Sequence, residues 1–430
     1  MKPDPAPHTQ ATLANGMQVF LKEIHTAPLI GSWLWYRVGS RDERPGRTGL
    51  SHWTEHMQFK GTPRFPARKL DRAISRVGGS WNAMTFLDWT CYYATMPAAS
   101  IDLILELEAD RMLNSHFDEK EVAAERSVVI SEREGNENEP LFRLGEAIQH
   151  AAFRVHPYRH EVIGEMEDLR SLGREELYDH YRTYYVPNNA VLSLAGDFET
   201  QPMLERIRAL FEPLPAGAVP PRISEVEPPL GGEVRLEVSG PGETAYVQAA
   251  YRFPPAAHPD FFALGVMDSL LAGPGSLSMF GGGLSNKTSR LYRALVDHEL
   301  AVGIAAGASA TIDPFLYGFS LTVHPQRTPE EALAALDAEI ERLQSEPVPE
   351  EEVRRAVKQV RALFSYGSES ISNQAFWMGY AEMFASHDWF LGFLEALEQV
   401  SAAQVTRVAR EYLQPANRVV GFYRPEGGAS

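Results

Sequence analysis

The sequence predicts an α+β protein of two homologous, α/β-sandwich-like halves, each a mixed, mostly antiparallel sheet with helices on one face. Three observations predict this fold. The same helix, proline-asparagine turn and apolar run occur at two distant places, strand-like segments open each half, and a segment rich in proline and glycine separates the halves. Two such halves are expected to face each other across a cleft.

The repeat is clearest where each half ends. Residues 181–196 read YRTYYVPNNAVLSLAG and residues 409–424 read AREYLQPANRVVGFYR. The matching pairs are Arg182 and Arg410, Tyr184 and Tyr412, Pro187 and Pro415, Asn189 and Asn417, and Val191 and Val419. Proline ends a helix and asparagine favours a turn, so both stretches predict a helix, a turn and a buried strand.

The start of each half and the segment between the halves set the domain boundaries. MQVFLKEI and SWLWYRV open the first half, and EVRLEVSG and AYVQAAYRF open the second, each with the composition of strands. Between them, PLPAGAVPPRISEVEPPLGG (213–232) can sustain neither a helix nor a central strand. We therefore predict an N-terminal half at 1–212, a linker at 213–232 and a homologous C-terminal half at 233–430.

Composition excludes several classes of protein. The 430 residues are 44% hydrophobic and 23% charged, as in globular proteins, and no apolar run is long enough to span a membrane. A net charge of −17 disfavours nucleic acid as a partner. Cys91 is the single cysteine, so an intrachain disulfide is impossible. Because the polar, proline-containing N-terminus does not resemble a secretory signal, we expect a cytoplasmic protein.

The segment GLSHWTEHMQFKG predicts a metal site in the first half. It places His52, Glu55 and His56 in the spacing H-x-x-E-H. Residues four apart lie on one face of a helix, so both imidazoles can reach one ion. Two imidazoles suit Zn²⁺, and the neighbouring carboxylate of Glu55 can take a proton from a water activated by the metal. This is the inverse of the commoner H-E-x-x-H pattern.

A catalytic zinc normally takes three protein ligands, and a second helix offers carboxylates for the third. EVAAERSVVISEREGN has a helical pattern in which Glu121, Glu125, Val128 and Glu132 lie three or four apart on one side. This helix is expected to lie against the helix that carries the two histidines.

With these motifs the chain resembles the inverzincin zinc metallopeptidases, a family that includes pitrilysin, insulysin and the mitochondrial processing peptidase, and it is most like the short-chain bacterial members. GGSWNAMTFLDWTCYYATMP (78–97) and HPYRHEVIGEMEDLRSL (156–172) match further family segments. The resemblance implies one zinc ion per chain, Glu132 as the third ligand and Glu125 as a supporting acidic residue. Glu134 is a rival ligand on the same helix.

The resemblance also implies how a substrate binds. In such enzymes a peptide adds a strand to an exposed sheet edge, and Asn82 and Ala83 occupy the matching positions here. Because binding of this kind uses main-chain hydrogen bonds, the expected activity is an endopeptidase acting on unstructured peptides, with Glu55 as the catalytic base.

One departure from the family predicts a partner. Members that act alone carry an arginine and a tyrosine in the second half, at positions that hold Val296 and Gly303 here. Arg290, Tyr292 and Arg293 lie nearby but out of register. We therefore expect the metal-bearing subunit of a two-subunit peptidase, with a homologous subunit supplying the missing pair.

Three alternatives remain open: a processing peptidase subunit, a scaffold subunit and a nucleotide hydrolase. A presequence-type processing peptidase subunit and a non-catalytic scaffold subunit share the fold. GGGLSNKT (281–288) nearly matches a phosphate-binding loop, but Asn286 stands where that motif requires glycine. His156 and His160 are four apart like a metal pair, yet Pro157 favours a loop there.

Overall fold

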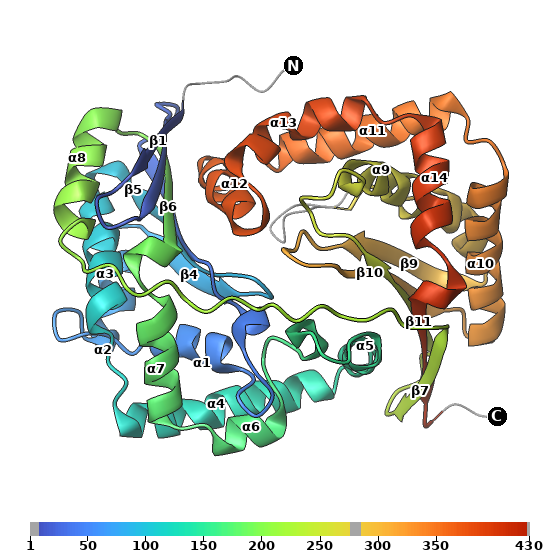
Figure 1. The fold of residues 1–430 in the computed structure, drawn as a ribbon, viewed down its shortest axis with the longest axis horizontal. Coiled ribbons are helices and arrows are strands. Elements are labelled where there is room, and N and C mark those ends of the chain that lie inside the picture. Colours follow the sequence, from blue (N-terminus) through green and yellow to red (C-terminus); the bar gives the residue numbers. More distant parts are fainter. Residues whose placement is uncertain (1–7, 276–284, 428–430) are drawn as a thin grey trace. The chain divides into compact units, whose positions relative to one another are not determined.

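The computed structural model describes residues 8–275 and 285–427 and forms two mixed sheets with helices (Figure 1). It divides into two compact units. Unit 1 comprises residues 1–133, 160–224 and 368–390, and unit 2 comprises residues 134–159, 225–367 and 391–430. Among the described residues, no helix has both the length and the apolar character needed to cross a membrane.

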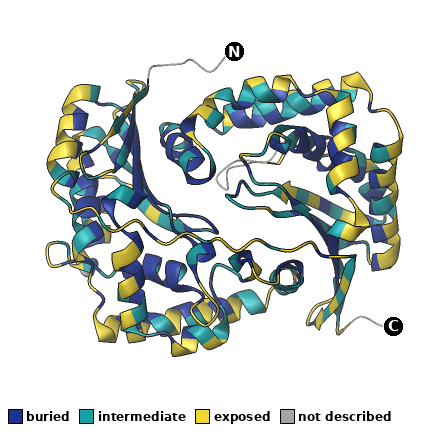
Figure 2. Cartoon of the chain, in the orientation of Figure 1, coloured by how far each residue is buried: buried dark blue, intermediate teal, exposed yellow. Residues whose placement is uncertain are grey.

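The sheet of unit 1 has six strands in the order β1-β2-β6-β3-β5-β4. The strands are β1 (His8–Thr12), β2 (Gln18–Glu23), β3 (Leu29–Tyr36), β4 (Ser80–Thr85), β5 (Thr90–Pro97) and β6 (Ala190–Gly196). Only β2 and β6 pair in parallel among these strands. The central strand β6 is buried along its whole length (Figure 2), whereas β4 lies at an edge.

Helices cover both faces of this sheet. The helices of unit 1 are α1 (Leu50–Met57), α2 (Ala67–Arg76), α3 (Ile101–Asn114), α4 (Glu119–Glu137), α6 (Met166–Ser171), α7 (Arg174–Tyr184), α8 (Thr200–Phe211) and α12 (Ile371–Phe384). The sequence predicts helices on one face only. Because successive strand residues point to opposite faces, β3 directs Trp33 and Trp35 toward Phe376 of α12 and directs Tyr36 to the other side. Helix α12 thus covers an aromatic face that would otherwise meet water.

The sheet of unit 2 repeats this connectivity with five strands in the order β7-β11-β8-β10-β9. The strands are β7 (Val234–Gly240), β8 (Tyr246–Phe253), β9 (Ala301–Ala308), β10 (Phe315–Val323) and β11 (Arg418–Pro425). The helices are α5 (Pro140–Ala152), α9 (Phe261–Ala272), α10 (Pro329–Ser345), α11 (Glu350–Tyr366), α13 (His387–Glu398), which continues from unit 1, and α14 (Ala402–Tyr412). Again one pair, β7 with β11, is parallel and the described others are antiparallel.

The predicted repeat extends to individual hydrogen bonds. Asn189 donates its amide N–H to the carbonyls of Tyr184 and Arg37, at 3.0 and 3.2 Å. Asn417 makes the matching pair of bonds to Tyr412 and Arg252, at 3.4 and 3.1 Å. Each asparagine therefore fixes the turn between a helix, α7 or α14, and the strand that follows it. Two similar α+β halves, each with a mixed and mostly antiparallel sheet, are confirmed.

The compact units depart from the contiguous halves in two places. Residues 134–159 lie in the first half of the sequence but belong to unit 2, where α5 packs on β11, β7 and β8. Residues 368–390 lie in the second half of the sequence but belong to unit 1. Residues 213–232 contain no helix or strand, as expected for a linker. The boundaries 1–212, 213–232 and 233–430 stay predictions about the sequence repeat, and the cleft between the halves stays a prediction too.

Candidate metal centre

Helix α1 brings two imidazoles together near its middle. It begins after Gly49, whose left-handed backbone (φ 85°) turns the chain sharply into the helix. His52 and His56 lie one turn apart, with ring centroids 4.6 Å from each other. The spacing predicted from the sequence therefore gives two imidazoles on one face.

Glu132 of α4 lies opposite both rings. Its carboxylate oxygens are 3.8 Å from His52 Nε2 and 3.6 Å from His56 Nε2. One ligand atom from each of the three residues lies within 4.8 Å of the other two. These separations are too long for hydrogen bonds, but they suit atoms that each lie about 2.0–2.2 Å from a shared zinc ion. The three residues predicted as ligands thus fit a zinc ion.

The environment of His52 keeps its ring neutral. Burial, and to a smaller extent the neighbouring His56, lower the pKa of His52 to about 3. A buried ring nitrogen of the same residue, Nδ1, has no hydrogen-bond partner among the described residues. A neutral imidazole is the form that binds a metal ion.

Glu125 orients the second imidazole. Its Oε1 is 2.9 Å from His56 Nδ1, and its other oxygen forms an ion pair with Lys60. Burial opposes a low pKa for Glu125, but the hydrogen bonds from His56 and Lys60 prevail and lower it. For His56, burial lowers the pKa, and Glu125 and the nearby carboxylates outweigh that effect. The bond at Nδ1 leaves Nε2 facing Glu132, as a ligating histidine requires.

Glu55 lies beside the two histidines and is 9% exposed. Burial raises the pKa of its carboxyl group. Thr85, at the end of β4, donates its hydroxyl to Glu55 Oε2 at 2.6 Å. This bond holds one oxygen and ties the candidate base to the edge strand. No sequence motif marks Thr85 or Lys60 as a site residue, although Lys60 lies only four positions after His56.

The predicted substrate residues lie on the same edge strand. Asn82 and Ala83 pair with Tyr93 and Tyr92 of β5, and β4 has no strand on its other side among the described residues. The Asn82 side chain is exposed. The free backbone edge of β4 is therefore available for pairing with an extended chain.

The other candidates fall elsewhere. Glu134 is not in the group formed by His52, His56 and Glu132. A short 3₁₀ turn, Pro157–Arg159, separates His156 from His160, so the predicted loop is confirmed. Val296 ends a one-turn π-helix, Tyr292–Val296, and Gly303 lies on β9. Half of the segment at 281–288 lies outside the described residues.

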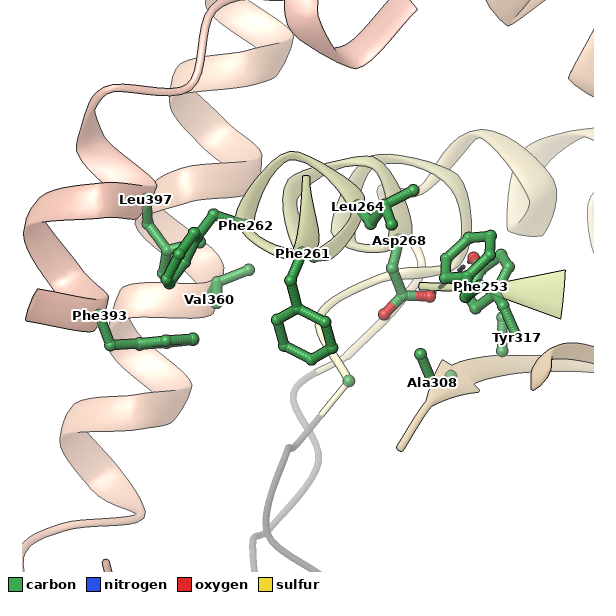
Figure 3. Close-up of a pocket in the computed structure, with 14 residues that line it drawn as sticks. Phe253, Phe261, Phe262, Leu264, Asp268, Ala308, Tyr317, Val360, Phe393 and Leu397 are labelled. Atoms are coloured by element: carbon green, nitrogen blue, oxygen red, sulfur yellow. Dashed lines mark hydrogen bonds between the residues drawn. The ribbon is translucent and has the colours of Figure 1, made fainter. Parts of the chain in front are cut away.

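A cavity of about 160 Å³ in unit 2 has different chemistry (Figure 3). Phe261, Phe262 and Phe393 supply much of its apolar wall. Asp268 of α9 points into it and accepts a hydrogen bond of 2.8 Å from the Tyr317 hydroxyl. Among the residues that line the cavity, Asp268 is the single one of the usual metal-binding types, so the cavity does not offer a zinc site.

Comparison with known proteins matches the sequence of this chain to a family. The family model described as "Insulinase (Peptidase family M16)" matches residues 18–165, and the model "Peptidase M16 inactive domain" matches residues 171–360. Zinc protease PqqE of Helicobacter pylori is 28% identical over 97% of this chain and 93% of its own length. A probable mitochondrial-processing peptidase subunit beta of Arabidopsis thaliana is 28% identical over 95% of this chain and 77% of that protein.

The fold agrees with these relatives. The crystal structure of a protease from Helicobacter pylori superposes with a TM-score of 0.90 at 28% identity, over 98% of this chain and all of that one. The M16 inactive domain from Pseudomonas fluorescens, at 17% identity and a TM-score of 0.85, shares the fold. The chain therefore belongs to the M16 family of peptidases, whose members include proteins named as zinc proteases.

Proposed function

We propose that this protein is a zinc-dependent endopeptidase that cleaves unstructured peptides. One observation carries the proposal: His52, His56 and Glu132, which lie far apart in sequence, offer ligand atoms within 4.8 Å of one another. Glu55, a buried carboxyl group suited to proton transfer, lies in the same turn of helix as the histidines.

The side chains divide the chemistry among them. His52, His56 and Glu132 would hold one zinc ion, which when bound polarises a water molecule and the scissile carbonyl group. Glu55 takes the proton from the attacking water and later delivers it to the leaving amine. Because burial raises the pKa of Glu55, its carboxylate is a stronger base than an exposed one and the acid it forms still gives up its proton. Thr85 holds one Glu55 oxygen, which leaves the other for the water.

The edge strand β4 supports an extended substrate. A peptide that adds a strand beside Asn82 and Ala83 would pair through its main chain, which tolerates many sequences but requires an unfolded segment. The bond from Thr85 to Glu55 links this strand to the base, so a peptide bound at the edge lies next to the candidate catalytic group.

The second half supports a role within a two-subunit enzyme. Val296 and Gly303 offer neither a guanidinium nor a phenol at the positions where the family resemblance implies an arginine and a tyrosine in members that act alone. The Arabidopsis thaliana relative is itself named as a subunit. In this proposal the chain is the metal-bearing subunit, and a homologous subunit supplies the missing pair.

The experiment compares hydrolysis of a quenched-fluorescence, unstructured peptide by the zinc-loaded chain alone and by the chain mixed with a homologous subunit. We expect cleavage that a chelator abolishes and that rises strongly in the mixture. Full activity of the lone chain would refute the two-subunit role, and no activity in either sample would favour the scaffold alternative. Faster cleavage of cationic, presequence-like peptides than of neutral ones would favour a processing peptidase.

A further inference from the structure

A buried carboxyl group caps the helix that carries the two histidines. Glu43, which is 2% exposed, accepts the backbone N–H groups of Gly49 and Ser51, both at 2.7 Å. Gly49 is the N-cap of α1, and Ser51 lies in its first turn. The first N–H groups of a helix have no partner within it, and a negative group there also interacts favourably with the helix dipole. Glu43 therefore fixes the backbone on the N-terminal side of His52.

A histidine that the proposed chemistry does not use holds Glu43 in turn. His160 Nε2 lies 3.0 Å from Glu43 Oε2, and the His160 side chain is almost fully buried. Three donors thus converge on the two oxygens of one carboxyl group. The sequence singled out His160 as an apparent metal pair with His156, whereas the structure gives it a partner on the loop before α1.

Other residues of the 160–168 segment contact the same helix start. Asp168 accepts both the backbone N–H and the hydroxyl of Thr48, at 2.9 and 2.6 Å. Glu165 donates its backbone N–H to the Thr48 hydroxyl at 2.8 Å. The 160–168 segment therefore holds the residue before the N-cap as well as Glu43.

Two glycines allow the backbones to touch. Gly49 and Gly164 both have left-handed conformations, with φ of 85° and 88°. A Cβ atom on Gly164 would lie 2.6 Å from the Gly49 Cα and N atoms, closer than non-bonded atoms approach. Such a contact leaves little freedom for the start of α1 to move relative to the 160–168 segment.

We propose that Glu43, held by His160, is the positioning residue of the metal-binding helix. The proposal rests on the zinc-peptidase function proposed above. Glu43 binds Ser51, which directly precedes His52, and Gly49, the N-cap of the helix. Through these two bonds Glu43 sets the position of the first turn along the helix axis and its rotation about that axis. Small displacements of a ligand matter because a metal site requires its donor atoms at short, fixed distances.

The variant Glu43→Gln tests this role with little change in size. Its amide has one acceptor oxygen, and its NH₂ group would face a donor, so at least one of the three bonds is lost. We expect the zinc dissociation constant, measured by chelator competition, to rise about tenfold or more, the range seen when groups that orient metal ligands are changed. At saturating zinc we expect kcat to fall while KM for the peptide stays constant.

Variants at His160 test whether it acts through Glu43. His160→Leu removes the donor and should weaken zinc binding, whereas His160→Gln can still donate to Glu43 and should restore part of the affinity. In the Glu43→Gln background, His160→Leu should add little further loss, because residues that act as one unit are not additive. If Glu43→Gln fails to fold, the two His160 variants carry the test, since they leave both backbone bonds of Glu43 intact.

Glu227→Gln is the matched control. Glu227 is a half-buried carboxyl group of unit 2 that accepts the backbone N–H groups of Arg154, Val155 and His156, each at 2.9 Å. The Glu227→Gln variant should lower the melting temperature of the protein without changing its affinity for zinc. Equal zinc affinity in the wild type, Glu43→Gln and Glu227→Gln would overturn the positioning role. Zinc binding without peptidase activity in the wild type would overturn only the proposed function, because the affinity comparison would still stand.

Discussion

The two histidines of α1 differ in their surroundings although the sequence presents them alike. His52 is kept neutral by burial, whereas His56 is held by Glu125, which Lys60 holds in turn. The buried, neutral His52 and the oriented His56 form one side of the site. Glu132, whose side chain is 44% exposed, forms the other. The more exposed carboxylate is the ligand with the greatest freedom to adjust when an ion binds.

Replacing the candidate base separates chemistry from metal binding. Glu55→Gln keeps the shape of the side chain but cannot accept the proton, so we expect peptide hydrolysis to fall by roughly 10²–10⁴-fold. Zinc content, measured by atomic absorption, should stay at one ion per chain, because Glu55 is not among the three grouped ligands. Glu134→Gln, a change on α4 outside that group, should leave both activity and zinc unchanged. Normal turnover by Glu55→Gln would show that the base is another residue.

Replacing Glu125, which orients His56, should mainly lower the affinity for zinc. Glu125→Gln weakens the bond to His56 Nδ1 and leaves Lys60 without its ionic partner at that site. We expect zinc affinity to fall by about 10–100-fold, as for other residues that orient metal ligands. Titration with a chromogenic chelator measures this change. An affinity equal to that of the wild type would mean that the bond to His56 is not needed to orient the ring.

The sequence predicted those site residues whose relation is local. His52, Glu55 and His56 lie within one helix, so their spacing alone places them on one face. Glu132 required the resemblance to a family, because nothing in its own segment says where α4 lies. Thr85 contacts Glu55 across 30 residues of sequence, and His160 contacts Glu43 across 117. Single-sequence patterns carry no information on such contacts.

Among the helices and strands, α12 shows why packing could be predicted only in part. The strand-like segments were predicted to within about three residues of β2, β3, β7 and β8, because alternation and β-branched or aromatic residues mark them. Helix α12 is apolar on nearly every side, with Phe376, Trp377 and Tyr380 buried. An all-round apolar helix indicates burial, but the pattern does not say on which sheet.

The contact between α12 and the first sheet depends on a glycine. A Cβ atom on Gly379 would overlap the Trp35 indole and lie 2.7 Å from the Ser193 hydroxyl. We expect Gly379→Ala to lower the free energy of unfolding by about 1–3 kcal/mol, the usual cost of overpacking a core. Urea denaturation followed by tryptophan fluorescence measures it. Gly265→Ala in α9, where a Cβ meets nothing within 4 Å, should be neutral or stabilising.

The cavity of unit 2 predicts a pH-dependent stability. Burial outweighs the hydrogen bond from Tyr317 and raises the pKa of Asp268 from its usual 3.8 to about 7. The folded state therefore holds a proton that the unfolded state has lost, so stability falls as pH rises from about 4 to about 7 and then levels off. The Asp268→Asn side chain cannot ionise and can still accept the Tyr317 bond. The stability of this variant relative to the wild type should therefore grow over this window, to about 4 kcal/mol at pH 8.

Thermal unfolding at a series of pH values measures the stability of Asp268→Asn relative to the wild type. Tyr317→Phe removes the donor that favours the charged carboxylate, so the pH window should move upward in that variant. A stability difference between Asp268→Asn and the wild type that stays constant from pH 4 to pH 8 would contradict the account.

For the chain as a whole, the duplication was predictable and the exchange of segments was not. The proline-asparagine turns of the two halves match residue by residue and lead to the same strand position in each sheet. The exchange of residues 134–159 and 368–390 between units depends on which apolar faces meet after folding. That choice is a property of the whole sequence, and local patterns do not encode it.

The central claim is that one zinc ion is held by His52, His56 and Glu132. Anomalous diffraction at the zinc edge from crystals of the zinc-loaded protein tests it most directly. The account predicts a single strong peak at about 2.0–2.2 Å from His52 Nε2, His56 Nε2 and a Glu132 oxygen. A zinc peak elsewhere, or one at the two histidines with Glu132 turned away, would contradict it.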